Sequence, residues 1–163
     1  MNLYEFGRWK QQIAEKLAAD PNIREILLPA PQPDAGSETP PSASPAPDLS
    51  EYLFNYEYVP GAQDEPKALI SLEAAAPKVT GRGAFQVVLS VYALCHKSLL
   101  STYSRAGVQG TRVDVLCADI DRLVSGLGGL GIGAAALTAV ERYAPAPDYY
   151  GRVLTYSIPA FNR

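Results

Sequence analysis

The feature that most limits how this chain can fold is an uncharged stretch, "AFQVVLSVYALC", which runs from Ala84 to Cys95. Apolar side chains occupy both its odd and its even positions, and β-branched residues are frequent. Such a strand is expected in the middle of a sheet that is covered on both sides, or of a sheet with one face at an interface. The stretch therefore predicts a central strand, around which the other elements have to be arranged.

Two shorter extended segments precede this strand. In "EYLFNYEYVP", aromatic residues from Tyr52 to Tyr58 fall at every second position, which is typical of a strand with aromatic side chains on one face. The next segment, "PKALISLEAAAP", has small or apolar residues on one side: Ala68, Ile70, Leu72 and Ala74. Turns at Pro60-Gly61 and in "KVTGRG" separate the segments. Consecutive strands joined by short turns favour an antiparallel meander.

Apolar residues at helical spacing mark two helices. The first covers the opening segment and ends at Asp20-Pro21, because the residue before a proline is pushed out of helical geometry. A short apolar element, helical or extended, follows in "NIREILLP". The second helix lies in "TRVDVLCADIDRLVSGLG", where Thr111 and Asp114 resemble a capping arrangement and Gly126 or Gly128 supplies the end.

The chain closes with two extended runs, "ALTAVERY" and "GRVLTYSI". The intervening "APAPDYYG" is rich enough in turn residues to make a hairpin, with Tyr149 and Tyr150 ahead of the last strand. The order helix, three strands, helix, two strands predicts one α+β domain over residues 1–163. Its sheet is largely antiparallel, of about five strands, with two main helices packed on it.

A Pro-rich stretch interrupts this pattern at about residues 29–50. Residues 29–47, "PAPQPDAGSETPPSASPAP", include no aromatic residue and hold half of the fourteen prolines of the chain. Such a composition buries too little apolar area to offset the entropy of ordering. We expect a flexible, exposed loop.

Composition and charge exclude some classes of protein. The chain has 163 residues, enough for one hydrophobic core. Its net charge of -3 and pI of about 5.1 argue against a basic surface that wraps nucleic acid, but not against a protein that lets nucleic acid pass. The sequence shows no signal-peptide pattern, and no apolar run reaches the ~18 residues of a membrane span. We expect synthesis and assembly in a cytoplasm.

The candidates for chemistry are weak. Gly126, Gly128 and Gly131 match a dinucleotide-loop spacing but follow a helix and precede a strand, so we expect them to end the helix and return the chain to the sheet. A single histidine, His96, excludes a multi-histidine zinc site. Cys95 lies next to it on a strand, so the two side chains point to opposite faces and cannot form a nucleophile pair.

Two further groups have ordinary interpretations. Cys95 and Cys117 lie in apolar periodic stretches and are interpreted as buried, reduced thiols. Asp114 and Asp121 share a helix face, but seven residues separate them by ~10 Å along the axis, too far to hold one ion. We interpret this face as solvated, and we expect no catalytic residue, cofactor or metal. A metal-dependent enzyme that uses these carboxylates stays as an alternative.

Three segments carry a resemblance to a known family: "YVPGAQDEPKALISLEA", "GTRVDVLCADIDRLV" and the terminal "YYGRVLTYSIPAFNR". With the order of the elements they resemble the tail terminator and head-tail joining (neck) proteins of tailed bacteriophages. The resemblance covers roughly Tyr52 to Arg163. It rests on pattern, because none of the segments is a catalytic signature. The Pro-rich stretch departs from the compact form of that family.

The resemblance implies a structural protein of the virion and not an enzyme. Such proteins form a hexameric ring that ends growth of the tail tube and docks the tail to head completion or adaptor proteins, around a channel for the genome. The implied partners are therefore further copies of the chain, the tail tube protein and the head proteins. DNA passes without sequence-specific binding, and no membrane is involved. A head completion or stopper protein is the alternative within the same class.

Two turns are the candidate interfaces with neighbouring copies or partners. One contains Lys78, Thr80 and Arg82, and the other contains Tyr149, Tyr150 and Arg152. Tyrosine combines a large contact area with a polar tip and is favoured at interfaces, although a half-buried sheet face uses it equally well. Each turn therefore has the alternative of an ordinary exposed turn.

Overall fold

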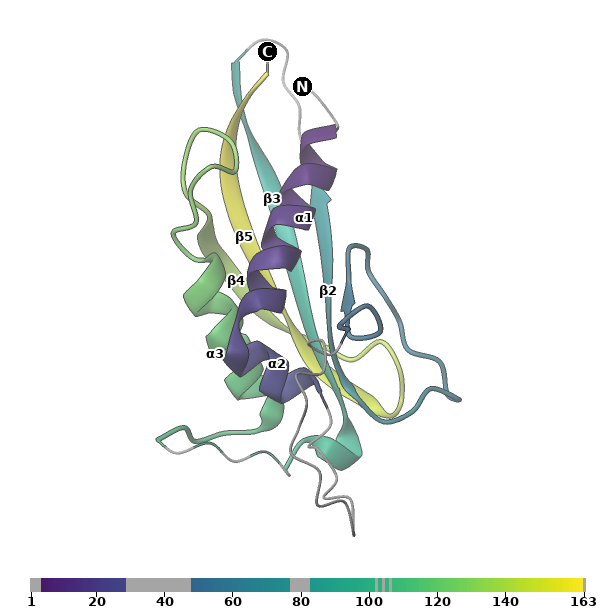
Figure 1. Ribbon diagram of the computed structural model, residues 1–163. Coiled ribbons are helices and arrows are strands. Elements are labelled where there is room, and N and C mark those ends of the chain that lie inside the picture. Colours follow the sequence, from purple (N-terminus) through teal and green to yellow (C-terminus); the bar gives the residue numbers. More distant parts are fainter. Residues whose placement is uncertain are drawn as a thin grey trace.

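A computed structural model describes residues 4–28, 48–76, 83–101, 103, 105 and 107–162, and every structural statement refers to these residues. They form one α+β domain (Figure 1). The helices are α1 (Tyr4–Ala19), α2 (Pro21–Leu27), α3 (Arg112–Val124) and the short 3₁₀ helix η1 (Lys97–Leu99). The strands are β1 (Leu53–Phe54), β2 (Ala68–Ala75), β3 (Gly83–His96), β4 (Ala136–Tyr143) and β5 (Tyr149–Asn162).

The five strands form one sheet in the order β1-β2-β3-β5-β4. The predicted central strand is confirmed, because β3 lies between β2 and β5 and pairs antiparallel with both. The β4–β5 hairpin is also confirmed. β3 and β5 are longer than their neighbours, so they continue as a two-stranded arm beyond the ends of β2 and β4 (Figure 1).

The first predicted strand is wrong in length and direction. Only Leu53 and Phe54 form β1, and they pair parallel to β2, so the first three strands are not an antiparallel meander. The aromatic residues after it do not alternate along a strand. Phe54 and Tyr58 stack on each other with their ring centroids 4.1 Å apart, which requires the chain to turn between them. Aromatic packing overrides the period-two pattern there.

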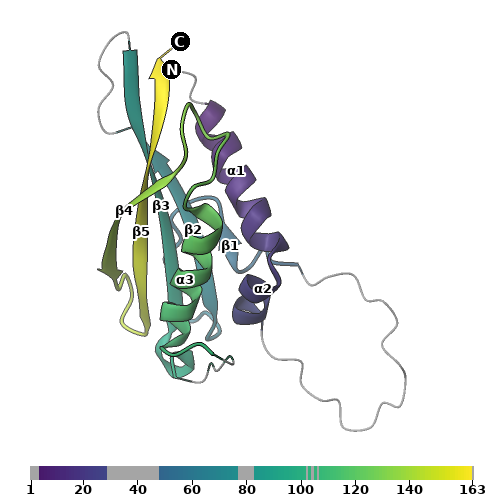
Figure 2. The ribbon, with the colours of Figure 1, turned by 90° about the vertical axis from the view of Figure 1, so that its left-hand side faces the viewer.

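All three α-helices cover one face of the sheet, here called the helix side (Figure 2). The predicted inward face of β2 is confirmed, since its small and apolar residues join this core. Each fully buried Leu or Ile in this layer contributes about 1.5–3 kcal/mol of hydrophobic free energy. The largest buried side chains from the helices are Trp9, Ile13, Leu17, Ile23, Ile26 and Leu116.

Asp20 separates α1 from α2. Its side chain accepts the backbone N–H groups of Asn22 and Ile23 at 3.0 and 3.1 Å, while Pro21 occupies the first turn of α2. Proline tolerates that position because its missing N–H would have no helical partner. The predicted break at Asp20-Pro21 is confirmed, and the short apolar element after it is helical.

The predicted cap of the second main helix is confirmed. Thr111 and Asp114 form a reciprocal capping box at the start of α3. At the other end Gly126 follows the last turn with φ 76°, a conformation that glycine adopts without strain. The glycine segment then returns to the sheet, where a Cβ on Gly131 would lie 2.4 Å from the carbonyl oxygen of Pro159. In the described part of the chain no helix begins after these glycines, so they offer no helix N-terminus for a dinucleotide phosphate.

The second face of the sheet, here called the open side, carries no helix among the described residues (Figure 2). Residues 55–67 cover only its lower part, near the β4–β5 turn. Within the described part of one copy, coverage of the central strand is therefore complete on the helix side only. No helix in the described part of the chain is long and apolar enough to cross a membrane.

Candidate interface surfaces

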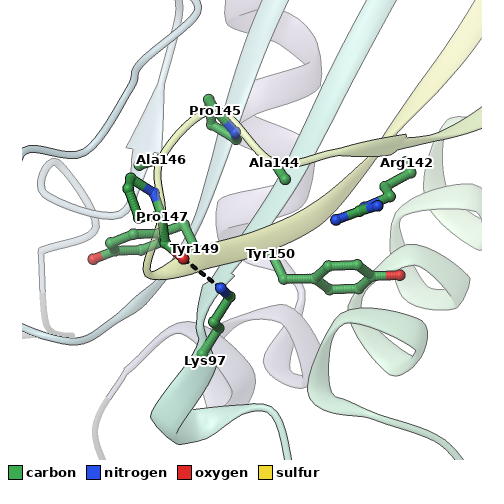
Figure 3. A pocket seen from close by; sticks show the side chains of 8 residues that line it. All are labelled: Lys97, Arg142, Ala144, Pro145, Ala146, Pro147, Tyr149 and Tyr150. Carbon is green, nitrogen blue, oxygen red and sulfur yellow. Dashed lines mark hydrogen bonds between the residues drawn. The ribbon is translucent and has the colours of Figure 1, made fainter.

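The predicted turn around Tyr149 forms a shallow hollow of about 380 Å³ at one end of the sheet (Figure 3). It lies between the end of β3 and the β4–β5 turn. Its lining combines two cations, two aromatic rings and a Pro-rich turn: Lys97, Arg142, Ala144, Pro145, Ala146, Pro147, Tyr149 and Tyr150. The hollow is open to one side and holds no deep chamber, so it fits a protein segment better than an enclosed small molecule.

The two tyrosines of this turn have different environments. Tyr149 is the first residue of β5, not a residue ahead of it, and only 2% of it is exposed. It lies on the open side with Leu69 and Leu94, and its hydroxyl donates to the carbonyl oxygen of Glu65 at 3.3 Å. Tyr150 lies on the helix side and is partly exposed. The two rings point to opposite sides of β5 (Figure 3). Only Tyr150 has surface to offer a partner.

The cations of the hollow are held in place but keep exposed surface. Lys97 donates its Nζ to the carbonyl oxygen of Pro147 (Figure 3). Arg142 lies over the ring of Tyr150, with 5.9 Å from the guanidinium carbon to the ring centroid. Such a cation–π contact orients the guanidinium without consuming all of its donors. The hollow therefore presents positive charge beside an aromatic ring.

Arg152 lies beside this hollow, on the helix side of β5. Its guanidinium is 3.3 Å from the carboxylate of Asp114, and this cation, after the hydrogen bonds from Thr111, helps to hold the pKa of Asp114 below its usual range. Arg152 also pairs across the sheet with Arg142. The pairing places two cations side by side at the edge of the hollow.

Tyrosines and carboxylates hold residues 55–67 against the open side. The hydroxyl of Tyr143, on β4, donates to the carboxylate of Glu57. The hydroxyl of Tyr58 donates to Asp64 at 2.7 Å. This bond raises the pKa of Tyr58 to about 12 and lowers the pKa of Asp64. Burial and Glu57 together raise the pKa of Tyr143. We call residues 55–67 the strap.

The open side is nearly free of cations. On the open side of strands β2 to β5 and of the strap, Lys67 is the one cationic side chain among the described residues, and it lies over the ring of Tyr52. Arg142 and Arg152 point to the helix side. The carboxylates on this side are Glu57, Asp64, Glu65 and Glu141, while Glu73 at the β2 edge turns its carboxylate to Lys10 of α1. Between them small neutral residues such as Ser90 and Thr155 face outward. The sheet thus has an acidic side and a side that carries the cations of the hollow.

Strand β4 is an exposed sheet edge. It pairs with β5, and among the described residues no strand pairs with its other edge. Leu137 and Val140 on its helix side are 38% and 46% exposed. A bulge at Thr138 lets both face the same side, since Leu137 pairs with Tyr156 and Val140 with Leu154. An edge strand with unpaired backbone groups and apolar side chains is a site for pairing with another strand.

The other groups singled out in the sequence take structural positions. Asp121 accepts a hydrogen bond from the hydroxyl of the buried Tyr156 at 3.1 Å, whereas Asp114 belongs to the capping box of α3. The described residues contain no cluster of three or more groups that could hold a metal ion. His96 ends β3 and caps η1. The thiols of Cys95 and Cys117 are free, and burial raises their pKa to about 11 and about 12.

The remaining predicted interface residues, Lys78, Thr80 and Arg82, lie outside the described residues. So does most of the predicted Pro-rich loop, from residue 29 to 47. Conversely, sequence reasoning missed Lys97 and Arg142, which come to Tyr150 only through the sheet register. It also missed that Leu137 and Val140 share a face, because residues three apart in a regular strand point to opposite faces. The run of apolar residues in "ALTAV" was the available signal for an exposed edge.

Comparison with known proteins gives one finding. The YomW family model matches residues 20–158, which is most of the chain. The family name is of the kind given to gene products of a Bacillus phage, and it indicates a phage-related protein. A search of curated proteins gives no match.

Proposed function

The chain belongs to the YomW family, and on this premise we propose that it is a structural protein of a tailed-phage virion. Its proposed role is that of a tail terminator: a ring of identical subunits caps the tail tube and joins the tail to the head. The ring leaves a central channel for the genome. Its proposed partners are the tail tube protein and a head completion or adaptor protein, and its proposed place is the neck of the virion.

The observation that carries this proposal is the distribution of charge over the sheet. A channel for DNA has to avoid holding the phosphates, and binding to phosphates depends on Lys and Arg that replace counterions. The open side offers carboxylates and neutral Ser, Thr and Val side chains, with Lys67 near its lower end. We propose that this side faces the channel and that the helices face outward.

The shape of the subunit supports the same arrangement. A ring closes through contacts between two different surfaces of identical subunits, and a one-layered sheet with helices on one side offers two free edges for such contacts. If the strands run roughly along the ring axis, the hollow at Tyr150 lies on one end of the ring and the β3–β5 arm on the other. The two ends then serve the two axial partners. We propose six subunits only because the chain resembles the tail terminator proteins, which form hexameric rings.

The hollow supports a protein partner with acidic groups. Arg142 and Lys97 present positive charge beside the exposed face of Tyr150. Arginine and tyrosine are frequent in the energetically important centres of protein interfaces. We propose that one axial partner places a carboxylate-bearing segment in this hollow.

The test is the assembly state of the purified full chain. Size-exclusion chromatography with light scattering is expected to give a closed oligomer, and negative-stain images are expected to show rings with a central hole. Pull-down with isolated tail tubes distinguishes a tail terminator from a head completion protein. A chain that stays monomeric at high concentration and binds neither tail tubes nor heads contradicts the proposal.

A further inference from the structure

We infer that the subunits join head to tail, with β4 of one copy pairing antiparallel with the free edge of β2 in the next copy. This inference rests on the proposed ring and names its subunit contact. It commits to a second copy of the chain as the occupant of the β4 edge. The reasons are the position of two free edges, their direction, and the apolar surface that each leaves uncovered.

The first free edge is the upper half of β4. From Ala136 to Val140 it carries no charge, and its charged residues Glu141 and Arg142 follow only lower down. Natural edge strands commonly carry a charge or a proline that discourages pairing. The upper half of β4 lacks both, although Thr138 forms a bulge whose hydroxyl donates to the carbonyl oxygen of Thr155 at 3.0 Å.

The second free edge is the upper half of β2. Strand β1 pairs with β2 only at Ile70 and Ser71, so no strand lies along the outer edge from Leu72 to Ala75 among the described residues; the backbone N–H of Ala74 there donates to the carboxylate of Glu73 at 2.8 Å. The neighbouring half of α1 is open as well. Among the described residues, nothing lies within 4 Å of a Cβ built on Gly7. The surface beside this edge can therefore receive another chain.

The two edges lie at the same height in the sheet. One row of cross-strand partners joins Ala136, Ser157, Val88 and Ala75, and another joins Val140, Leu154, Val91 and Leu72. The free part of β4 and the free part of β2 thus begin and end at matching levels. A second copy placed beside the first, without a shift along the strands, brings the two edges together.

The strand directions also agree. β2 is antiparallel to β3, β3 to β5 and β5 to β4, so β4 runs opposite to β2. Rotation about an axis parallel to the strands preserves these directions. Pairing of β4 with β2 of the next copy is then antiparallel, the more stable ladder. It joins two different surfaces, which is the kind of contact that closes into a ring.

The edge pairing alone is too small to hold a ring. About five residues of strand span roughly 17 Å, and with a sheet ~10 Å thick they present on the order of 170 Å². A standard interface buries about 800 Å² per partner. A second copy supplies further contact, because its α1 packs on its own β2 and comes to lie over the exposed Leu137 and Val140. A lone partner strand brings no such helix.

The pairing buries no unpaired charge. Glu73 is the charged residue in this part of β2, and its carboxylate accepts the N–H of Ala74 at 2.8 Å and lies 3.5 Å from Nζ of Lys10 on α1. Pairing at Ala74 exchanges that N–H bond for one to β4, and Lys10 stays as the counterion of Glu73. The facing stretch of β4 is uncharged. Opposite this stretch, an acid with its own counterion is tolerated, whereas an isolated carboxylate is costly to bury.

Cysteine cross-linking in the full chain tests the contact. Ala136 and Ala75 are both exposed, on the open side and at the same level, so A75C/A136C is expected to give a ladder of covalent oligomers after mild oxidation. A75C/A139C is expected to cross-link instead if β4 is shifted along β2 so that Ala139, the next open-side residue of β4, lies opposite Ala75. The single variants are expected to stay as monomer bands. Native Cys95 and Cys117 are present in every variant and set the background.

The outcomes separate this inference from the proposed function. Rings that form without either cross-link overturn the edge pairing and leave the proposed ring intact. Efficient dimers of A136C alone indicate a symmetric β4–β4 contact and also overturn it. Monomers throughout contradict both proposals.

A second pair of variants checks the apolar part of the contact. V140K is expected to raise the concentration at which the ring dissociates by at least tenfold, whereas V59K, an equally exposed valine on the strap, leaves it unchanged. Circular dichroism and thermal unfolding confirm that both variants fold. A folded V140K that assembles like the wild type overturns the inference.

Discussion

Tyr143 on β4 donates a hydrogen bond to Glu57, so the strap reaches from the β1 edge of the sheet to the opposite edge strand. The two residues are 86 positions apart in the chain. Their contact closes the lower part of the open side over Leu69, Leu94 and Tyr149. The first prediction tests whether this one contact holds the strap.

Replacing Tyr143 by Phe removes the hydroxyl and leaves the carboxylate of Glu57 without this donor. We expect a loss of about 1 kcal/mol in the free energy of unfolding, the usual net contribution of such a bond. Urea denaturation measures it. E57Q with Y143F in a double-mutant cycle gives the coupling between the two groups. Y56F, at an exposed tyrosine of the strap, is the control and should be neutral. A coupling of zero contradicts the role given to the pair.

The strap should respond to pH at both ends of the scale. The hydrogen bond from Tyr58 and the N–H of Gly61 lower the folded-state pKa of Asp64, so its contribution is present above an unfolded pKa of about 3.9 and is lost as the pH falls through the folded value. The pKa of Tyr58 is raised to about 12, so its contribution is complete below an unfolded pKa of about 10 and is lost as the pH rises through about 12.

Ultraviolet titration of the phenolate checks the alkaline side. D64N is expected to shift the titration of Tyr58 toward pH 10, because the carboxylate that disfavours the phenolate is gone. Y58F identifies the signal of Tyr58 among the other tyrosines. An unchanged Tyr58 titration in D64N contradicts the contact.

The proposed channel lining predicts a gain of DNA binding. Ser90 and Thr155 are cross-strand partners on the open side, and S90K/T155K places two cations there. The assembled variant is expected to retain duplex DNA at low salt and to release it as salt rises, whereas the wild type retains none. Q12K/Q109K adds the same charge at exposed positions off the open side and should leave passage unaffected. Fluorescence anisotropy at several salt concentrations measures the difference.

Tyr150 and Tyr149 should behave differently when replaced. Y150A and R142A remove exposed contacts of the hollow, and each is expected to weaken binding to the axial partner at least tenfold with little loss of stability. Y149A empties a buried position and is expected to cost about 3 kcal/mol of folding stability. Pull-down and thermal unfolding, run on the same samples, separate the two effects. Equal binding by Y150A and the wild type would remove the hollow from the interface.

The parts of the fold that could be predicted depend on local chemistry. The uncharged stretch in β3 can only be a central strand, and the Thr111–Asp114 box fixes the start of α3 within the chain itself. Asp20-Pro21 likewise ends one helix and begins the next through neighbours in sequence. Each of these signals lies within a few residues, so no distant partner is needed to interpret it.

The parts that could not be predicted depend on distant partners. Tyr56 and Tyr58 have the spacing of a strand, but both rings pack on Phe54, Tyr56 edge-on and Tyr58 stacked, which turns the chain away from β2. Tyr149 belongs to β5 because His96 pairs with it across the sheet, a relation that no local pattern contains. The candidate interface was only half predicted for the same reason: Tyr150 was visible in the sequence, whereas its partner Arg142 was brought to it by the hairpin register.

The bulge at Thr138 shows that the number of residues in β4, as well as their type, decides which side chains share a side of the strand. Because one extra residue is inserted, Leu137 and Val140 share a side that an unbroken strand would divide between them. Deleting Thr138 would therefore leave an unbroken strand in which Leu137 and Val140 keep their shared side, because the residue removed is the one without a partner on β5. The same one-residue deletion elsewhere in β4, with Thr138 kept and the bulge flattened, would put the two apolar side chains on opposite sides of the sheet.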